Sequence, residues 1–68
     1  MNTIHFIVDE SDEGFSARAV GADIVTETRN LAELHEQVRD AVRCHFSPAT
    51  MPSLIRLHIT REVVLDTR

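Results

Sequence analysis

The pattern that most constrains the fold is a single amphipathic segment, residues 31–46. Its apolar side chains recur every three or four residues, as they do on one face of an α-helix. Asn30 precedes the segment and Glu33 follows three residues later, the spacing of a helix N-terminal cap, with Thr28 as the competing first residue. Pro48 ends the pattern, because the residue before a proline is pushed out of the helical conformation. The sequence therefore predicts one helix.

Four other segments have the period-two alternation or the β-branched residues of strands. They are residues 3–9, 15–20, 24–26 and 54–60. The expected core-facing residues of the three longer strands are Ile4, Phe6 and Val8; Phe15, Ala17 and Ala19; and Ile55, Leu57 and Ile59. A polar hairpin that ends in Gly14 joins the first two strands. The small alanines of the second strand would let the helix lie close above it.

This order of elements predicts an α+β fold, β-β-β-α-β, in which one helix covers one face of a mixed sheet in a two-layer sandwich. A right-handed crossover through the helix would bring the last strand beside the first and parallel to it. The 68 residues, 43% of them hydrophobic, form a single domain, residues 1–68, with a thin core. Its one cysteine, Cys44, cannot form an internal disulfide, so we expect a homodimer.

The charge balance limits the partners of the chain. Seven basic and eleven acidic residues give a net charge of −4, which opposes adhesion to nucleic-acid phosphates or acidic membranes. All three phenylalanines are assigned to the core or the helix, so aromatic stacking on bases and direct nucleic-acid binding are not expected. We find no long apolar span and no basic, apolar start typical of a secretory signal, and therefore expect a cytoplasmic protein without membrane contact.

Four short stretches follow one another in a distinctive order. They are Asp-Glu-Gly-Phe at 12–15, Ile-Val-Thr-Glu at 24–27, Leu-Ala-Glu-Leu at 31–34 and Val-Arg-Asp-Ala-Val at 38–42. In this order they resemble the HicB-like antitoxins of HicA-HicB toxin–antitoxin pairs. The resemblance implies the same β-β-β-α-β fold, a partial ribonuclease H-like topology, and a non-enzymatic module that binds a HicA-like toxin protein. Antitoxins of this family usually carry a C-terminal DNA-binding segment, and only eight residues follow the last predicted strand here.

The sheet face away from the helix is the predicted partner-binding surface. Together with the aliphatic tail it would present His5, Ile7, Arg18, Val20, Arg56, His58, Val63, Val64 and Leu65. Arginine forks pair with carboxylates, and the aliphatic residues add apolar contact area. The competing interpretation is an ordinary half-solvated sheet.

A second hypothesis is a small-molecule or metal-binding regulatory domain that uses His5, Arg18, Arg56 and His58. The two histidines lie on strands predicted to be neighbours, so their rings could approach one another. Zinc would need a third and a fourth ligand, and Cys44 belongs to the helix layer. We therefore expect no metal site and no cofactor.

We do not expect an enzyme. Cys44 and His45 have no third group to orient them, and neighbouring residues on a helix point in different directions. Cys44 is instead predicted to be a small buried side chain near the helix end, with His35 and His45 at the boundary of the core. The acidic hairpin is predicted to be a solvated loop, with metal binding by Asp9 or Asp66 as the alternative.

Overall fold

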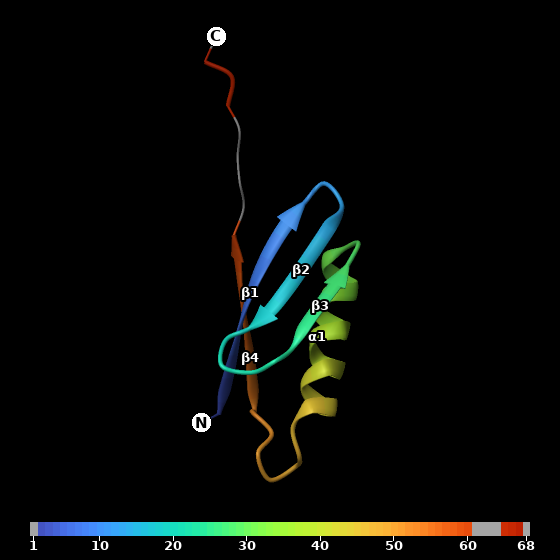
Figure 1. The fold of residues 1–68 in the computed structure, drawn as a ribbon, viewed down its shortest axis with the longest axis vertical. Coiled ribbons are helices and arrows are strands. Elements are labelled where there is room, and N and C mark those ends of the chain that lie inside the picture. Colours follow the sequence, from blue (N-terminus) through green and yellow to red (C-terminus); the bar gives the residue numbers. More distant parts are fainter. Residues whose placement is uncertain (1, 61–64, 68) are drawn as a thin grey trace.

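The computed structural model describes residues 2–60 and 65–67, and its elements follow in the order β-β-β-α-β (Figure 1). They are β1 (Thr3–Ser11), β2 (Gly14–Ala19), β3 (Val25–Thr28), α1 (Leu31–His45) and β4 (Leu54–Thr60). The predicted α+β class is confirmed. The last strand has the bounds expected from the sequence, and the third begins one residue later and extends to Thr28.

The four strands form one mixed sheet in the order β3-β2-β1-β4. β2 pairs antiparallel with both β1 and β3, and β4 pairs parallel with β1. Phe6 of β1 lies between Ala19 of β2 and Leu57 of β4 in the register. The last strand therefore returns beside the first and parallel to it, as the crossover rule predicts. β3 and β4 are the two edges of the sheet.

The hairpin between β1 and β2 is tighter than the sequence suggested. β1 continues to Ser11, and only Asp12 and Glu13 form the turn before β2 begins at Gly14. Gly14 has a φ of +133°, a conformation that residues with a Cβ rarely adopt. A Cβ at this position would also overlap the carbonyl oxygen of Thr28. The close approach of β2 to the end of β3 therefore requires glycine.

The helix begins at the predicted cap. The side chain of Asn30 accepts a hydrogen bond from the backbone N–H of Glu33 at 2.8 Å, which satisfies one of the free donors of the first turn. At the other end, the N–H of Phe46 donates to the carbonyl oxygen of Val42 at 3.1 Å. One face of α1 is buried, and it consists of Leu34, Val38 and Val42.

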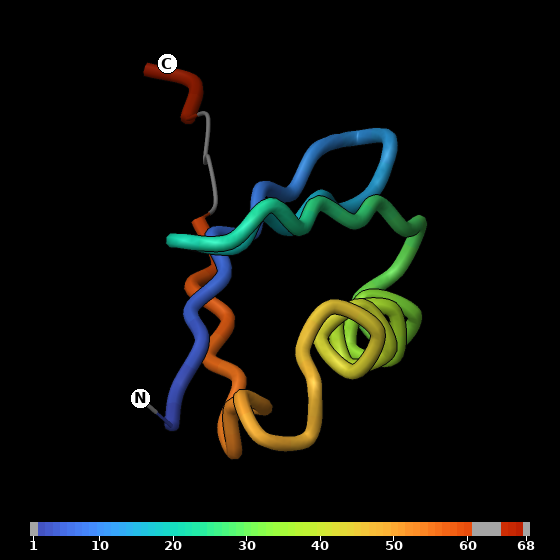
Figure 2. The backbone as a smooth tube through the Cα atoms, turned by 60° about the horizontal axis from the view of Figure 1, so that its bottom comes forward, coloured from blue at the N-terminus to red at the C-terminus, as the bar shows by residue number. Residues whose placement is uncertain are grey.

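The core lies between α1 and the sheet. Its buried residues are Ile4, Phe6, Val8, Ala17, Ala19, Ile24, Leu34, Val38 and Val42. The helix packs against β2 and β3, where the two alanines leave room for it (Figure 2). β4 lies away from the helix, and a loop over residues 46–53 connects the two. Ile59 is 45% exposed, so its expected place in the core is wrong, because α1 does not extend over β4.

Cys44 is exposed, so the expectation of a buried cysteine is wrong. An α-helix turns by about 100° per residue, so two steps after the buried Val42 place Cys44 on almost the opposite side of the helix. His35 and His45 are exposed as well. The buried stripe is therefore narrower than the apolar pattern suggested, because the helix contacts only part of the sheet.

Candidate functional site: the open face of the sheet

The sheet face opposite α1 has no helix over it in the described part of the chain (Figures 1 and 2). Residues that pair across neighbouring strands lie on the same face, so the register defines which side chains share it. The central row runs from His58 on β4 through Ile7 and Arg18 to Val25 on β3. Arg18 and Val25 are exposed and Ile7 is half-buried. We call this surface the open face.

A second row lies next to it, toward the start of β1. His5 pairs with Arg56 on β4, and on its other side its carbonyl oxygen accepts from the N–H of Val20 at 2.9 Å. Val20 is 59% exposed. Apart from the tail, the residues predicted for the open face are therefore brought together: His5, Ile7, Arg18, Arg56 and His58 on the strands, and Val20 directly after β2.

The two histidines are in direct contact. His5 Nδ1 and His58 Nε2 are 2.9 Å apart, and the ring centres are separated by 5.1 Å with an angle of 27° between the planes. One ring nitrogen must donate and the other accept, so at least one of the two imidazoles is neutral in this arrangement. The hydrogen bond links β1 to the edge strand β4 and fixes both rings on the open face.

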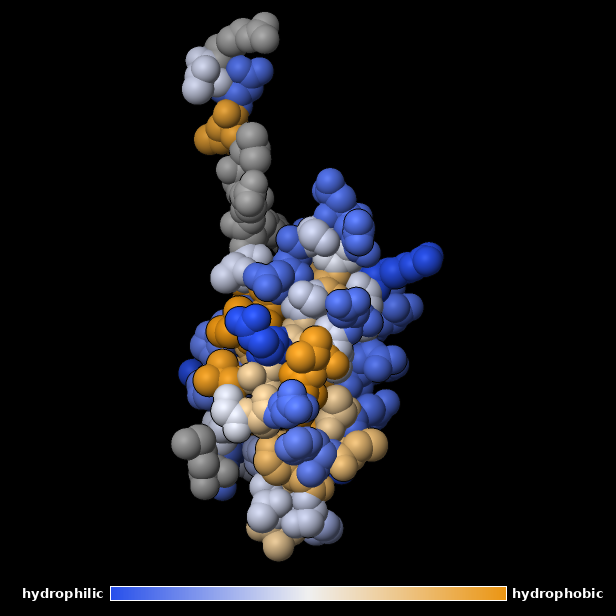
Figure 3. Space-filling view, viewed as in Figure 1, coloured by the Kyte–Doolittle hydropathy of each residue, from blue (hydrophilic) through white to orange (hydrophobic). Residues whose placement is uncertain are grey.

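The arginines of the open face are available to a partner. Arg18 and Arg56 are both exposed, and within the described residues neither has an ion-pair partner. Exposed Val20 and Val25 stand beside them. Figure 3 views the molecule from this side and shows hydrophobic and strongly hydrophilic surface interleaved over the middle of the sheet. This mixture of apolar area and guanidinium forks is typical of protein-binding surfaces.

The opposite end of the same face is acidic. Asp9 pairs with Ser16, which pairs in turn with Glu27, and the Thr60 hydroxyl donates to Asp9 Oδ1 at 3.0 Å. Glu13 lies nearby, lining the same shallow hollow. Among the described residues, no three histidine, cysteine or carboxylate side chains are grouped closely enough to hold a metal ion. The open face thus carries arginine and histidine side chains at its centre and at one end, and carboxylates at the other end.

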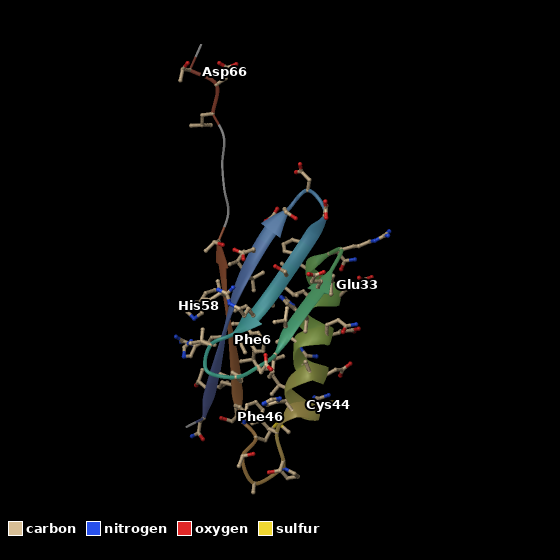
Figure 4. The ribbon with its side chains drawn as sticks, in the orientation of Figure 1. Phe6, Glu33, Cys44, Phe46, His58 and Asp66 are labelled. Atoms are coloured by element: carbon tan, nitrogen blue, oxygen red, sulfur yellow. The ribbon has the colours of Figure 1, made fainter. Side chains whose placement is uncertain are left out.

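Of the three tail residues predicted for this surface, the structure describes Leu65. Val63 and Val64 lie outside the described residues. Leu65 is 80% exposed, and residues 65–67 lie beyond the end of β4, away from the body of the sheet (Figure 1). Figure 4 also separates Cys44, on the helix, from His58, on β4, so the two do not share a site.

Sequence reasoning missed Val25 as a member of the open face. The short third strand was recognised, but its orientation was not assigned. Ile24, just before β3, is buried, whereas Val25 is 63% exposed. Two adjacent aliphatic residues in a short strand leave open which of them faces the core, and only the pairing of Val25 with Arg18 resolves it.

One relative places the chain in a family. A UPF0150 protein of Archaeoglobus fulgidus is 49% identical over 49 residues, which are 72% of this chain and 74% of the relative. The chain belongs to the UPF0150 family. No family model and no solved structure match this UPF0150 chain. Its α1, within the described residues, is too short and too polar to cross a membrane.

Proposed function

We propose that this UPF0150 protein is a non-enzymatic interaction module resembling the antitoxin of a type II toxin–antitoxin system. It acts as a homodimer and binds a HicA-like partner protein through the open face. The observation that carries the proposal is the row His58, Ile7, Arg18 and Val25, which crosses all four strands without a covering helix. The order of the HicB-like sequence stretches and the UPF0150 membership support the antitoxin-like role.

Charge supports a basic partner. The chain has a net charge of −4, and a toxin that binds RNA would carry a basic surface, so the two proteins attract each other on approach. On the open face, Arg18 and Arg56 would pair with carboxylates of the partner, and Asp9 and Glu27 with its cations. Opposite charges at the two ends of one surface would also orient the partner.

The test is co-expression with a HicA-like toxin from the same genome, followed by purification and calorimetric titration. We expect a complex of defined stoichiometry and rescue of the growth that the toxin inhibits. Arg18→Glu should weaken the complex at least tenfold, about 1.4 kcal/mol, because this arginine lies in the centre of the surface. The matched control is Arg29→Glu, also exposed but between β3 and α1. The absence of a complex, or equal losses for both variants, would contradict the proposal.

The histidine contact favours one second candidate, a regulatory domain that binds a small anion or a metal ion. His5 and His58 bring two ring nitrogens to 2.9 Å, and Arg56 pairs with His5 in the register. NMR titrations with inorganic phosphate and with Zn²⁺ would distinguish the ligands. Shifts of the His5 and His58 ring signals at a saturable stoichiometry support this candidate, and shifts equal to those of exposed His35 contradict it.

A further inference from the structure

The edge strand β4 is the least covered part of the fold. Ile55 and Leu57 face the helix side of the sheet but are only half-buried, and Ile59 on the same side is 45% exposed. Their pairing partners on β1 (Ile4, Phe6 and Val8) are all buried. An edge strand also presents unpaired backbone groups, which favour pairing with another strand. The other edge, β3, has four residues against seven and lies against α1.

A groove lies between β4 and the helix. It has a volume of about 600 Å³, and its apolar lining includes Val38, Val42 and Met51 together with Ile55 and Leu57 of β4. Its rim is cationic, with Arg39 and Arg43 on exposed positions of α1. The uncovered side of β4 and the groove therefore form one continuous surface, apolar inside and basic at its border.

We propose that a second copy of this chain occupies this surface, pairing its own β4 antiparallel with β4 across a two-fold axis near Leu57. A closed dimer with two-fold symmetry brings an edge strand against itself only in the antiparallel sense. With Leu57 on the axis, Ile55 of each chain lies opposite Ile59 of the other. The three half-covered aliphatic positions of each chain then form one apolar stripe across the joint.

The same geometry directs the end of the second chain into the groove. Antiparallel pairing takes the residues after Thr60 of one chain past Leu54 and Met51 of the other. In the sequence after Thr60, Val63 and Leu65 continue the period-two spacing of Leu57 and Ile59.

The charges of that segment match the groove. Glu62 precedes its aliphatic residues in the sequence, and Arg39 and Arg43 line the rim. Leu65 is 80% exposed in the single chain, so it has apolar surface that a neighbour can bury. Both the apolar and the charged features of the groove thus have counterparts in the chain itself, which is why we assign it to a second copy.

This inference rests on the homodimer of the proposed function and assigns it a surface separate from the proposed toxin site. The first test is disulfide trapping in a Cys44→Ser background. Chains carrying Arg56→Cys are mixed with chains carrying His58→Cys, and both positions are exposed. In the proposed dimer, residue 56 of one chain lies opposite residue 58 of the other. Opposite residues in antiparallel strands lie within disulfide reach. We expect rapid heterodimer cross-linking, and none when Val25→Cys replaces either partner.

The second test is the mass in solution, measured by light scattering. We expect a dimer for the wild type, a monomer for Ile59→Glu, and a dimer for the matched control Val25→Glu on the other edge strand. Leu65→Glu should raise the dimer dissociation constant at least tenfold. Circular dichroism of each variant verifies that it is folded, and the cross-linking test does not depend on Ile59→Glu folding.

The outcomes separate this inference from the proposed function. A wild-type monomer that still binds the toxin through Arg18 would overturn the β4 dimer and leave the toxin site in place. A dimer that Arg18→Glu disrupts and Ile59→Glu does not would also overturn it, because the joint would then be the open face. The β4 dimer would also be overturned if Ile59→Glu and Leu65→Glu both remained dimers and cysteines at positions 56 and 58 did not cross-link.

Discussion

Thr26 is the position where a single substitution should make this protein more stable. It lies on β3 opposite Ala17, so its side chain is on the helix side of the sheet. Its hydroxyl oxygen is buried and has no hydrogen-bond partner among the described residues. A buried hydroxyl without a partner loses its hydration on folding and costs about 1–3 kcal/mol. Thr26→Val removes this cost, keeps the shape of the side chain and keeps the β-branch that strands favour.

We expect the free energy of unfolding to rise by about 1 kcal/mol, the low end of that range because Thr26 is only half-buried as a whole residue. For a domain of this size, 1 kcal/mol corresponds to a rise in the melting temperature of about 4–8 °C. The chain has no tryptophan or tyrosine, so the helix signal in far-UV circular dichroism is the appropriate probe. Melts must be compared at equal protein concentration, because a dimer is stabilised by mass action.

Thr28→Val is the matched control. Thr28 lies two residues further on the same strand and the same face, but its hydroxyl donates to the carbonyl oxygen of Asn30 at 3.0 Å. Removing this hydrogen bond should lower stability by about 0.5 kcal/mol, since the bond is exposed to solvent. The two valine variants should therefore shift in opposite directions. An unchanged or lower melting temperature for Thr26→Val would refute the reasoning about the unpaired hydroxyl.

Two further substitutions test the turn and the helix cap by the same melts. Gly14→Ala should cost at least about 2 kcal/mol, because the new Cβ would meet both an unfavourable φ and the Thr28 carbonyl. Gly21→Ala, at a φ of +84° but with open space around it, should cost about 1 kcal/mol, and equal losses at both glycines would argue against the clash. Asn30→Ala should cost about 0.5–2 kcal/mol by leaving the Glu33 N–H without its cap, and Asn30→Asp should retain most of the stability. A loss for Asn30→Asp as large as that for Asn30→Ala would show that the side-chain oxygen is not the source of the effect.

Local patterns predicted the elements well where one periodicity dominated. The alternation from Leu54 to Thr60 predicted β4 with its observed bounds, and Asn30 predicted the start of α1. The β1–β2 turn was predicted too long, because polar residues such as Ser11 are compatible with either a strand end or a loop. In the structure, Ser11 pairs with Gly14 and therefore belongs to β1.

The sequence predicted the candidate site where it predicted both the order of the strands in the sheet and the face on which each side chain lies. His5 and His58 were expected on one face of adjacent strands, and the 2.9 Å contact between their rings confirms that arrangement. Val25 was missed because, in a short strand with two adjacent aliphatic residues, the sequence does not show which of the two faces the core. The groove beside β4 was missed because it depends on where the helix lies over the sheet, which no residue pattern within α1 encodes.

By itself, the sequence determined which segments form strands, which one forms the helix, and which side of β1 and β2 faces inward, because these properties depend on residues two to four positions apart. Only the tertiary structure decided that α1 lies over β2 and β3 and leaves β4 partly uncovered. That choice depends on contacts between segments tens of residues apart, on the small side chains of Ala17 and Ala19 and on the path of the loop before β4. The exposure of Ile59 follows from this one placement, because a single helix can cover only part of a four-stranded sheet.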